Sequence, residues 1–168
     1  MASPQKPTFE EWLAVSELAF DWAESYDDKD WARLRSILAP TLTIDYAKVN
    51  NAKFLDLPAD EFVEMMKNPL FLGDRNIDSQ HLLGLSKWEK ISDTEIVSQH
   101  QSRAAHCRWN EGRKTIAAKG HGHGLVTTTY RKIDGVWKWA GIKTKVRWNE
   151  HEFDRVFLGS AGKFDDEE

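Results

Sequence analysis

The C-terminal half of the sequence is built from four long runs of strand-forming residues, and this feature constrains the fold most. The runs are rich in Trp, Val, Ile and Thr, are divided by turn residues, and span 79–91, 94–109, 114–132 and 136–149. Asp134-Gly135 separates the last two runs, and such a dipeptide is the strongest short hairpin signal. Consecutive strands joined by short turns predict an antiparallel meander.

Helical patterns precede these strands. Thr8 and Glu11 form a capping-box pair that starts a predicted amphipathic helix ending near Tyr26. Its apolar positions, at three- and four-residue steps, are Phe9, Trp12, Leu13, Ser16, Phe20 and Ala23. Asp30 can cap a second short helix, which Pro40 ends.

The central segment completes the expected order of elements. Residues 42–46 alternate with period two and predict a first strand, whereas 71–79 contain Gly-Asp-Arg-Asn and predict a loop. Between them, a third helix is expected to begin at Pro58 and to present Phe62, Val63 and Met66 to a core. The chain is therefore predicted to be one α+β domain over 1–168, with helices on one side of a curved, mostly antiparallel sheet and flexible tails at 1–7 and 159–168.

The charge balance excludes several kinds of partner. Lys and Arg number 23 and Asp and Glu 27, and the four acids in excess form the tail 165–168. A neutral body lacks the basic surface that nucleic acids and anionic membranes require, so neither is expected as a partner. The single Cys107 excludes an intramolecular disulfide and a cysteine-rich zinc site. The polar start of the chain lacks the apolar core of a secretory leader, which favours an intracellular location.

Three polar residues share strand faces with apolar neighbours, since residues of equal parity lie on one face of a strand. Tyr46 lies with Leu42 and Ile44, His81 with Leu83 and Leu85, and His106 with Ile96 and Ala104. These three side chains are expected to point inward. Each could also be an ordinary hydrogen-bonded core residue.

His121 and His123 form the one histidine pair with metal-ligand spacing, and His100 is a candidate third ligand. The opposite face of that strand is small and apolar and carries Ile116, Ala118, Gly120, Gly122, Gly124 and Val126. The histidine pair is therefore predicted to lie outside, at the surface or in a subunit contact. No carboxylate follows between Leu125 and Tyr130, so neither this histidine pair nor the active site is expected to bind a metal.

Several motifs in order resemble fungal scytalone dehydratases over nearly the whole chain. They are Trp22 to Trp31 (WAESYDDKDW), Ile44-Asp45-Tyr46, Gln80-His81, His106, Gly120-His121-Gly122-His123 and Ile133 to Lys138 (IDGVWK). The first motif alone indicates only the wider NTF2-like fold, which hosts many activities. The ordered set of Tyr-Asp, Tyr, His and His is what narrows the resemblance.

This resemblance implies a cone-shaped barrel whose N-terminal helices close the pocket, a homotrimer, and a cofactor-free dehydratase, that is, a carbon–oxygen lyase. The implied substrate is a hydroxylated, partly reduced aromatic polyketide of melanin or related fungal biosynthesis. The implied compartment is cytoplasmic or endosomal.

The resemblance also assigns roles to residues. Tyr26 and Tyr46 would hydrogen-bond the substrate carbonyl, directly or through water, and His81 would move the proton alpha to it. His106, oriented by Asp27, would assist departure of the hydroxyl. The apolar pocket walls and a C-terminal lid would come from Trp22, Val49, Phe153 and Phe157. These residue types suit an elimination beta to a carbonyl, which needs a base near neutral pKa and donors aimed at the oxygen that gains charge.

Two positions depart from the family pattern. Gly124 and Val126 stand where the family has a serine and an asparagine, so the pocket is expected to have lost two polar contacts and to favour a ring other than scytalone. Two alternatives remain open at this stage. One is a decarboxylase, cyclase or isomerase acting on an anthraquinone- or xanthone-type intermediate; the other is a non-catalytic NTF2-like ligand-binding protein.

Overall fold

The computed structural model describes residues 5–157. Its elements in chain order are α1 (Phe9–Asp27), α2 (Trp31–Ile37), β1 (Leu38–Tyr46), α3 (Ala47–Asn50), β2 (Ala52–Pro58), α4 (Ala59–Met66), β3 (Ile77–Ser92), β4 (Glu95–Trp109), the 3₁₀ turn η1 (Glu111–Arg113), β5 (Ile116–Ile133), β6 (Val136–His151) and α5 (Phe153–Val156). The predicted order of helices followed by long strands is confirmed.

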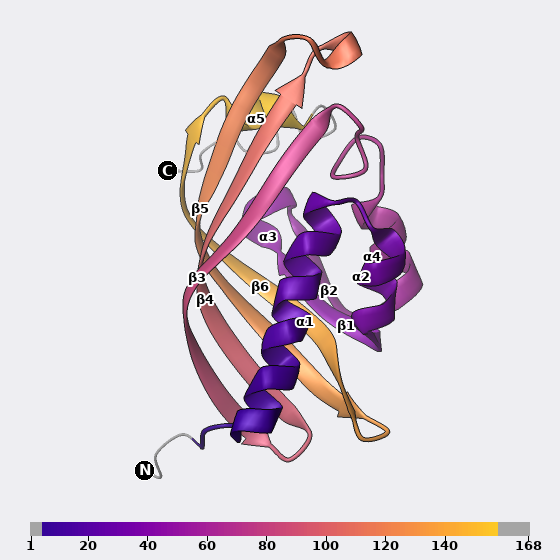
Figure 1. Cartoon of the computed structure of the whole chain (residues 1–168), viewed down its shortest axis with the longest axis vertical. Helices are drawn as coiled ribbons and strands as arrows, with labels where there is room; N and C mark the ends of the chain where they lie inside the picture. Colours follow the sequence, from indigo (N-terminus) through magenta and orange to yellow (C-terminus); the bar gives the residue numbers. More distant parts are fainter. Residues whose placement is uncertain (1–4, 158–168) are drawn as a thin grey trace.

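One six-stranded sheet organises the molecule, with strand order β2-β1-β6-β5-β4-β3. Strands β3 to β6 form the predicted antiparallel meander, while β1 pairs with β6 in parallel. The turn at Asp134-Gly135 has φ values of 50° and 81°, as a two-residue type I′ hairpin requires. The sheet curves strongly but is not closed, because β2 and β3 are its two edges (Figure 1).

The helices cover one side of this curved sheet, with α1 lying across it, α2 packed against α1 and α4 packed against α2 (Figure 1). The capping box at Thr8 and Glu11 is present, and the Asp30 side chain accepts from the Arg33 amide at the start of α2. In α4 the three predicted core residues, Phe62, Val63 and Met66, are buried. Local sequence signals therefore located these helices correctly.

The buried face of α1 differs from the predicted one. Phe9, Leu13 and Phe20 are exposed by 67%, 43% and 60%. The face against the sheet carries instead Val15, Ala19, Trp22, Ala23 and Tyr26. The helix has two apolar stripes at helical spacing, and only packing against the sheet decides which of them is covered. This choice turns Trp22 and Tyr26 toward the interior.

Residues 5 and 6, which belong to the segment 1–7 predicted to be a flexible tail, are hydrogen-bonded to the end of β3. The backbone carbonyl of Gln5 accepts from the Lys90 amide at 2.8 Å, and Lys6 Nζ donates to the Trp88 carbonyl at 3.1 Å. The expected tails at 1–4 and 159–168, including the acidic end, lie outside the described residues.

Four elements were not predicted: α3, β2, η1 and α5. Strand β2 has one buried side chain, Leu57, so it lacks the alternating pattern by which strands are recognised. The two α-helices have four residues each, too few for a helical period. The loop predicted over 71–79 is shorter, because β3 begins at Ile77.

Two glycines of β5 allow close backbone approach. A Cβ at Gly120 would lie 2.3 Å from the Phe153 Cα, so the absence of a side chain lets α5 pack onto the sheet. A Cβ at Gly124 would lie 2.2 Å from the Lys145 carbonyl oxygen, at a point where the β5–β6 register shifts between His123 and Gly124. The side-chain direction at Gly124 is therefore toward the backbone of β6.

Replacement of Gly124 by alanine is expected to destabilise the fold. The new methyl group would force apart two strand backbones, and such overpacking costs about 1–3 kcal/mol of unfolding free energy. Gly84 on β3 is the matched control, because its nearest neighbour would be an ordinary 3.5 Å from the new Cβ. Urea unfolding of both variants measures the difference; equal stabilities would contradict the close approach at Gly124.

Candidate active site

A cavity of about 120 Å³ lies between the sheet, the end of α1 and the C-terminal segment. On the same measure one water occupies roughly 10–15 Å³, so the cavity has room for a small organic molecule. Most of its walls are apolar, and four of the five predicted catalytic residues line it: Tyr26, Tyr46, His81 and His106. The predicted wall residue Trp22 lines it as well, whereas Asp27 is not among the lining residues. The predicted wall residues Val49, Gly124, Val126, Phe153 and Phe157 also line it. The structure thus brings together residues from α1, α3, β1, β3, β4, β5 and α5.

Two tyrosine hydroxyls meet at one wall of the cavity. The Tyr26 and Tyr46 oxygens are 3.1 Å apart, and both side chains are buried. Burial raises the pKa of Tyr26 and of Tyr46 above the ordinary value of 10.0, so both stay protonated near neutral pH. Trp22 packs on Tyr26 with ring centroids 5.0 Å apart and fixes this corner. Two hydroxyl donors are therefore held in a place that excludes bulk water.

Asp27 binds His81, which corrects the predicted pairing of Asp27 with His106. The Asp27 Oδ1 atom is 2.6 Å from His81 Nδ1, and Oδ2 accepts from the His81 backbone amide at 2.8 Å. Asp27 is the last residue of α1, and β3 passes that helix end, so the partner is decided by how the helix meets the sheet. With its Nδ1–H donated to the carboxylate, His81 has Nε2 available as an acceptor.

His106 has a different partner and a different environment. Its Nδ1 lies 2.8 Å from the hydroxyl of Ser79, the residue opposite it on β3. Burial, and secondarily the nearby His81, lowers the pKa of His106 well below 6.5. The His81 and His106 rings are 5.5 Å apart. His106 is thus neutral at physiological pH, and unlike His81 it is hydrogen-bonded to a hydroxyl rather than to a carboxylate.

The buried His106 makes a pH-dependent contribution to stability. Its pKa is lower in the folded chain than the ordinary 6.5 of an unfolded one. As the pH falls below about 6.5, the unfolded chain therefore binds a proton that the folded chain does not, and stability decreases. The slope from one such group is at most about 1.4 kcal/mol per pH unit. Stability is fully retained above that pH.

We expect His106→Gln to reduce this acid sensitivity, measured as the difference in unfolding free energy between pH 7 and pH 5. His151→Gln is the control, because His151 is exposed at the end of β6. The same slope in wild type and His106→Gln would contradict the lowered pKa. Burial also lowers the pKa of His100, so part of the acid sensitivity remains in both the wild type and His106→Gln.

The C-terminal segment closes the cavity beside His106. The ring centroids of Phe157 and Phe153 lie 4.9 Å and 5.8 Å from that of His106. Arg108 holds this wall in place, because its guanidinium donates to the Val156 carbonyl and to Asp74 at 2.7 Å. This wall lies where the apolar C-terminal lid was predicted, as far as Phe157.

The sequence analysis was wrong about the direction of Leu85 and missed several residues that line the cavity. Leu85, expected to share the inward face with His81, is 82% exposed because the β3–β4 register shifts between Leu83 and Ser86. The missed lining residues include Met66, Phe71, Leu72, Ile142 and Asn149. The parity of β6 could have indicated Ile142, but nothing local marks Asn149 or the loop residues. Ser79, the partner of His106, could have been found only from the β3–β4 register.

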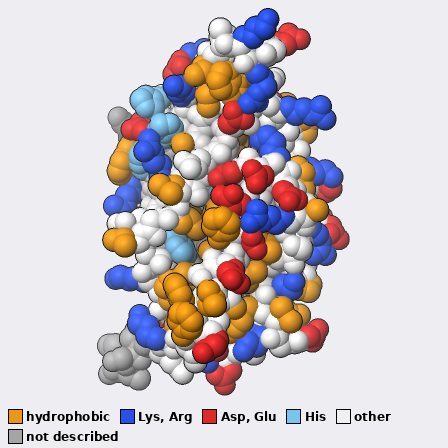
Figure 2. All heavy atoms as spheres, in the orientation of Figure 1, with side chains coloured by type: hydrophobic (Ala, Val, Ile, Leu, Met, Phe, Trp, Pro, Cys, Tyr) orange, Lys and Arg blue, Asp and Glu red, His pale blue; other side chains and the backbone are white. Residues whose placement is uncertain are grey.

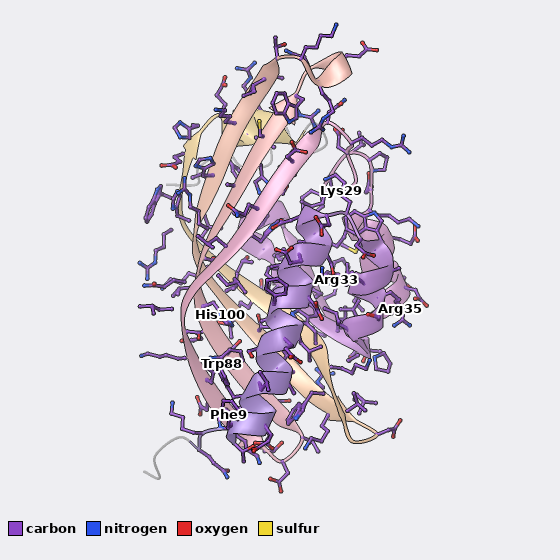
Figure 3. The ribbon with its side chains drawn as sticks, viewed as in Figure 1. Phe9, Lys29, Arg33, Arg35, Trp88 and His100 are labelled. Carbon is purple, nitrogen blue, oxygen red and sulfur yellow. The ribbon has the colours of Figure 1, made fainter. Side chains whose placement is uncertain are left out.

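His121 and His123 lie on the face of β5 opposite Gly122, whose missing Cβ would face Phe153. The geometry therefore agrees with the prediction that both side chains point outward. The argument that no carboxylate accompanies them was wrong, because it considered only residues 125–130. Glu150, directly opposite His121 on β6, supplies one. His100 is not a third ligand, since it is buried beside Ser98 and Trp88 in the lower half of the molecule (Figure 3).

Comparison with known proteins decides the family. The family model described as scytalone dehydratase matches residues 6–164. The chain belongs to the scytalone dehydratase family. It is therefore related to hydro-lyases for which no cofactor is implied, and the comparisons support a dehydratase of fungal melanin or related polyketide biosynthesis.

Individual relatives agree with this assignment. Scytalone dehydratase arp1 of Aspergillus fumigatus is 53% identical over 150 residues, covering 89% of each chain. Scytalone dehydratase PfmaJ of Pestalotiopsis fici is 45% identical over 162 residues, covering 96% of this chain and 85% of the relative. The crystal structure of the Kfla4162 protein from Kribbella flavida superimposes with a TM-score of 0.73 at 15% identity, covering 84% of this chain and 93% of the other. This last likeness shows the NTF2-like fold alone.

Proposed function

We propose that this family member eliminates water from a hydroxylated, partly reduced aromatic polyketide, using Tyr26, Tyr46, Asp27, His81 and His106. The observation that carries the proposal is the Asp27–His81 pair, which lies beside a buried tyrosine pair at the wall of an apolar cavity, with the His81 and Tyr26 ring centroids 5.3 Å apart. A carboxylate-oriented imidazole is a general base, and protonated hydroxyls are donors for an oxygen that gains charge. Both are needed to enolise a ketone.

The base in this proposal is His81. Its Nδ1–H donates to Asp27, which leaves Nε2 to take the proton alpha to the substrate carbonyl. The imidazolium that forms is stabilised by the Asp27 carboxylate 2.6 Å away. As the C–H bond breaks, negative charge moves to the carbonyl oxygen, where the Tyr26 and Tyr46 hydroxyls donate.

His106 supports the leaving hydroxyl as a neutral donor. If Ser79 donates to its Nδ1, the remaining proton lies on Nε2, toward the cavity. Because its lowered pKa keeps His106 neutral, this residue has no imidazolium proton to give. The proton that completes the departing water is therefore the one that His81 took from the carbon. The carbon–oxygen bond breaks, the ring gains a double bond, and His81 returns to its neutral form. Aromatisation of the product supplies much of the driving force.

A direct assay tests this function. Purified protein is incubated with scytalone and, separately, with a larger hydroanthracenone, while the ultraviolet absorbance follows aromatisation. Dehydration of either compound supports the proposal. Loss of CO₂ or ring closure without loss of water would favour a decarboxylase or cyclase, and no turnover of any such ring would favour a ligand-binding protein; both results contradict the proposal.

Val126 is expected to limit the use of scytalone. The residue is buried in the cavity wall where the family has an asparagine, so a substrate hydroxyl at that point would lose its hydrogen-bond partner. An unpaired polar group costs roughly 1–3 kcal/mol, or about one to two powers of ten in kcat/KM. The enzyme is therefore expected to use a larger or less hydroxylated ring better than scytalone.

Val126→Asn should raise kcat/KM for scytalone by about tenfold or more, because it restores an amide at the wall. Val126→Leu is the control, because leucine has nearly the same shape as asparagine but no hydrogen-bonding group. Equal effects of both substitutions on the scytalone-to-larger-ring ratio would overturn the specificity proposal. Gly124→Ser is not combined with Val126→Asn, because the Cβ of the serine would clash with the backbone of Lys145.

We also propose that the chain is a homotrimer in an intracellular compartment, cytoplasmic or endosomal, on the strength of the family resemblance. The free Cys107 is compatible with a reducing environment. Within residues 5–157, no helix is long and apolar enough to span a membrane. Light scattering of the purified protein measures the subunit number, and a monomer would contradict the trimer.

A further inference from the structure

A cluster of metal-ligating side chains, none of which the proposed mechanism uses, lies on the face of the sheet turned away from Phe153, although His123 is also among the residues that line the cavity. His121 and His123 are two residues apart on β5 and therefore share a face, and Glu150 is the direct cross-strand neighbour of His121 on β6. Figure 2 shows histidine side chains gathered with acidic and basic ones at one edge of the molecule. One ligand atom from each of the three residues lies within 4.8 Å of the other two.

The geometry points to a divalent zinc site formed by His121 Nδ1, His123 Nε2 and Glu150 Oε1, with the fourth position open to water. Bonds of about 2.0–2.2 Å place tetrahedral ligands about 3.3 Å apart. The Glu150 oxygen is 2.8 Å from His121 Nδ1 and 3.2 Å from His123 Nε2, which is close to that separation. Two imidazoles and one carboxylate suit Zn²⁺, whereas Mg²⁺ prefers oxygen ligands alone.

The ligands are held by their surroundings. The Trp148 ring stacks on His123 with centroids 4.6 Å apart and an interplanar angle of 8°, and His151 packs edge-on against His121 at 5.1 Å. His121 and His123 side chains are only 20% and 18% exposed. These rings are therefore restrained in orientation before any ion binds, which reduces the entropy lost on binding.

Arg103 competes for the same place. Its guanidinium lies 2.7 Å from His121 Nδ1 and 3.6 Å from the Glu150 carboxylate. The Arg103 side chain is 48% exposed and can turn into solvent when an ion binds. A positive charge so near the ligands weakens the attraction of the site for a cation. Removal of the Arg103 charge is therefore expected to tighten the binding of a cation.

The position of the site determines what an ion there would do. Glu150 is three residues before Phe153, the first residue of α5, and the site joins this end of β6 to β5. The His121 and His123 side chains lie on the face of β5 opposite the one that Phe153 contacts. A bound ion would therefore stabilise the strand end from which the C-terminal wall of the active site departs.

Calorimetric titration of tag-free, EDTA-treated and dialysed protein with ZnCl₂ tests the site. We expect one Zn²⁺ per chain, a rise in Tm with zinc, and no response to MgCl₂. Glu150→Gln and His123→Gln should each weaken binding at least about tenfold, the lower end of the effect of losing even an outer-shell partner. Arg103→Gln should tighten it. Having two ligand variants keeps the test usable if one of them fails to fold.

Two substitutions serve as controls. Glu152→Gln removes a nearby carboxylate that pairs with Arg155, and Cys107→Ser removes the only thiol. Both should bind zinc as the wild type does. The proposal is overturned if the wild type binds no zinc, if both ligand variants bind it as tightly as the wild type, or if either control substitution abolishes binding.

Discussion

His81→Ala is expected to lower kcat/KM at least about 100-fold, because general acid–base groups contribute factors of that size or more. His81 is paired with the Asp27 carboxylate, and its ring lies between Tyr26 and His106, with centroids 5.3 Å and 5.5 Å away. Loss of the imidazole removes the proposed base while the cavity walls stay in place. Steady-state kinetics with scytalone or the larger ring measures the effect.

His106→Ala is expected to lower kcat/KM by a similar factor, because His106 is the proposed donor to the departing hydroxyl. His151→Ala is the matched control, since this exposed histidine lies outside the cavity lining and should not affect turnover. Circular dichroism and a cooperative thermal transition show that each variant is folded. If His81→Ala or His106→Ala keeps near-normal turnover, the residue concerned has no part in the mechanism.

Asp27→Asn is expected to lower turnover by at least about 100-fold while leaving the fold nearly intact. An asparagine can still accept the His81 backbone amide, so the helix end remains tied to β3. Its NH₂ group, however, would donate to His81 Nδ1 and place the ring proton on Nε2, the wrong tautomer for a base. The charge that stabilises the imidazolium is lost as well.

The pH dependence of kcat distinguishes this effect from simple damage to the site. Removal of a charged group beside the proposed base should change the shape of the profile, whereas simple damage should lower kcat by the same factor at every pH. Asp28→Asn is the control, because the neighbouring Asp28 side chain is exposed at the helix end. An Asp27→Asn enzyme with wild-type kcat and an unchanged pH profile would show that Asp27 does not position His81.

The local sequence was sufficient for the elements that have a strong period or a specific turn residue. The long strands, the Asp134-Gly135 hairpin and the caps at Thr8 and Asp30 depend on interactions within a few residues. Strand parity also placed Tyr46 and His106 inside, because one face of each strand is covered. The set of cavity residues came from the ordered resemblance to a family, which no single motif could supply.

Contacts between distant residues were decided by the tertiary structure. Asp27 meets His81 rather than His106 because α1 ends beside β3, 54 residues away in sequence. Two apolar stripes made α1 ambiguous, and the sheet selected the stripe with Trp22 and Tyr26. Glu150 joins His121 and His123 only through the β5–β6 register. Periodicity shows which face a side chain lies on, but strand register and helix docking determine its neighbours, and these depend on the packing of the whole chain.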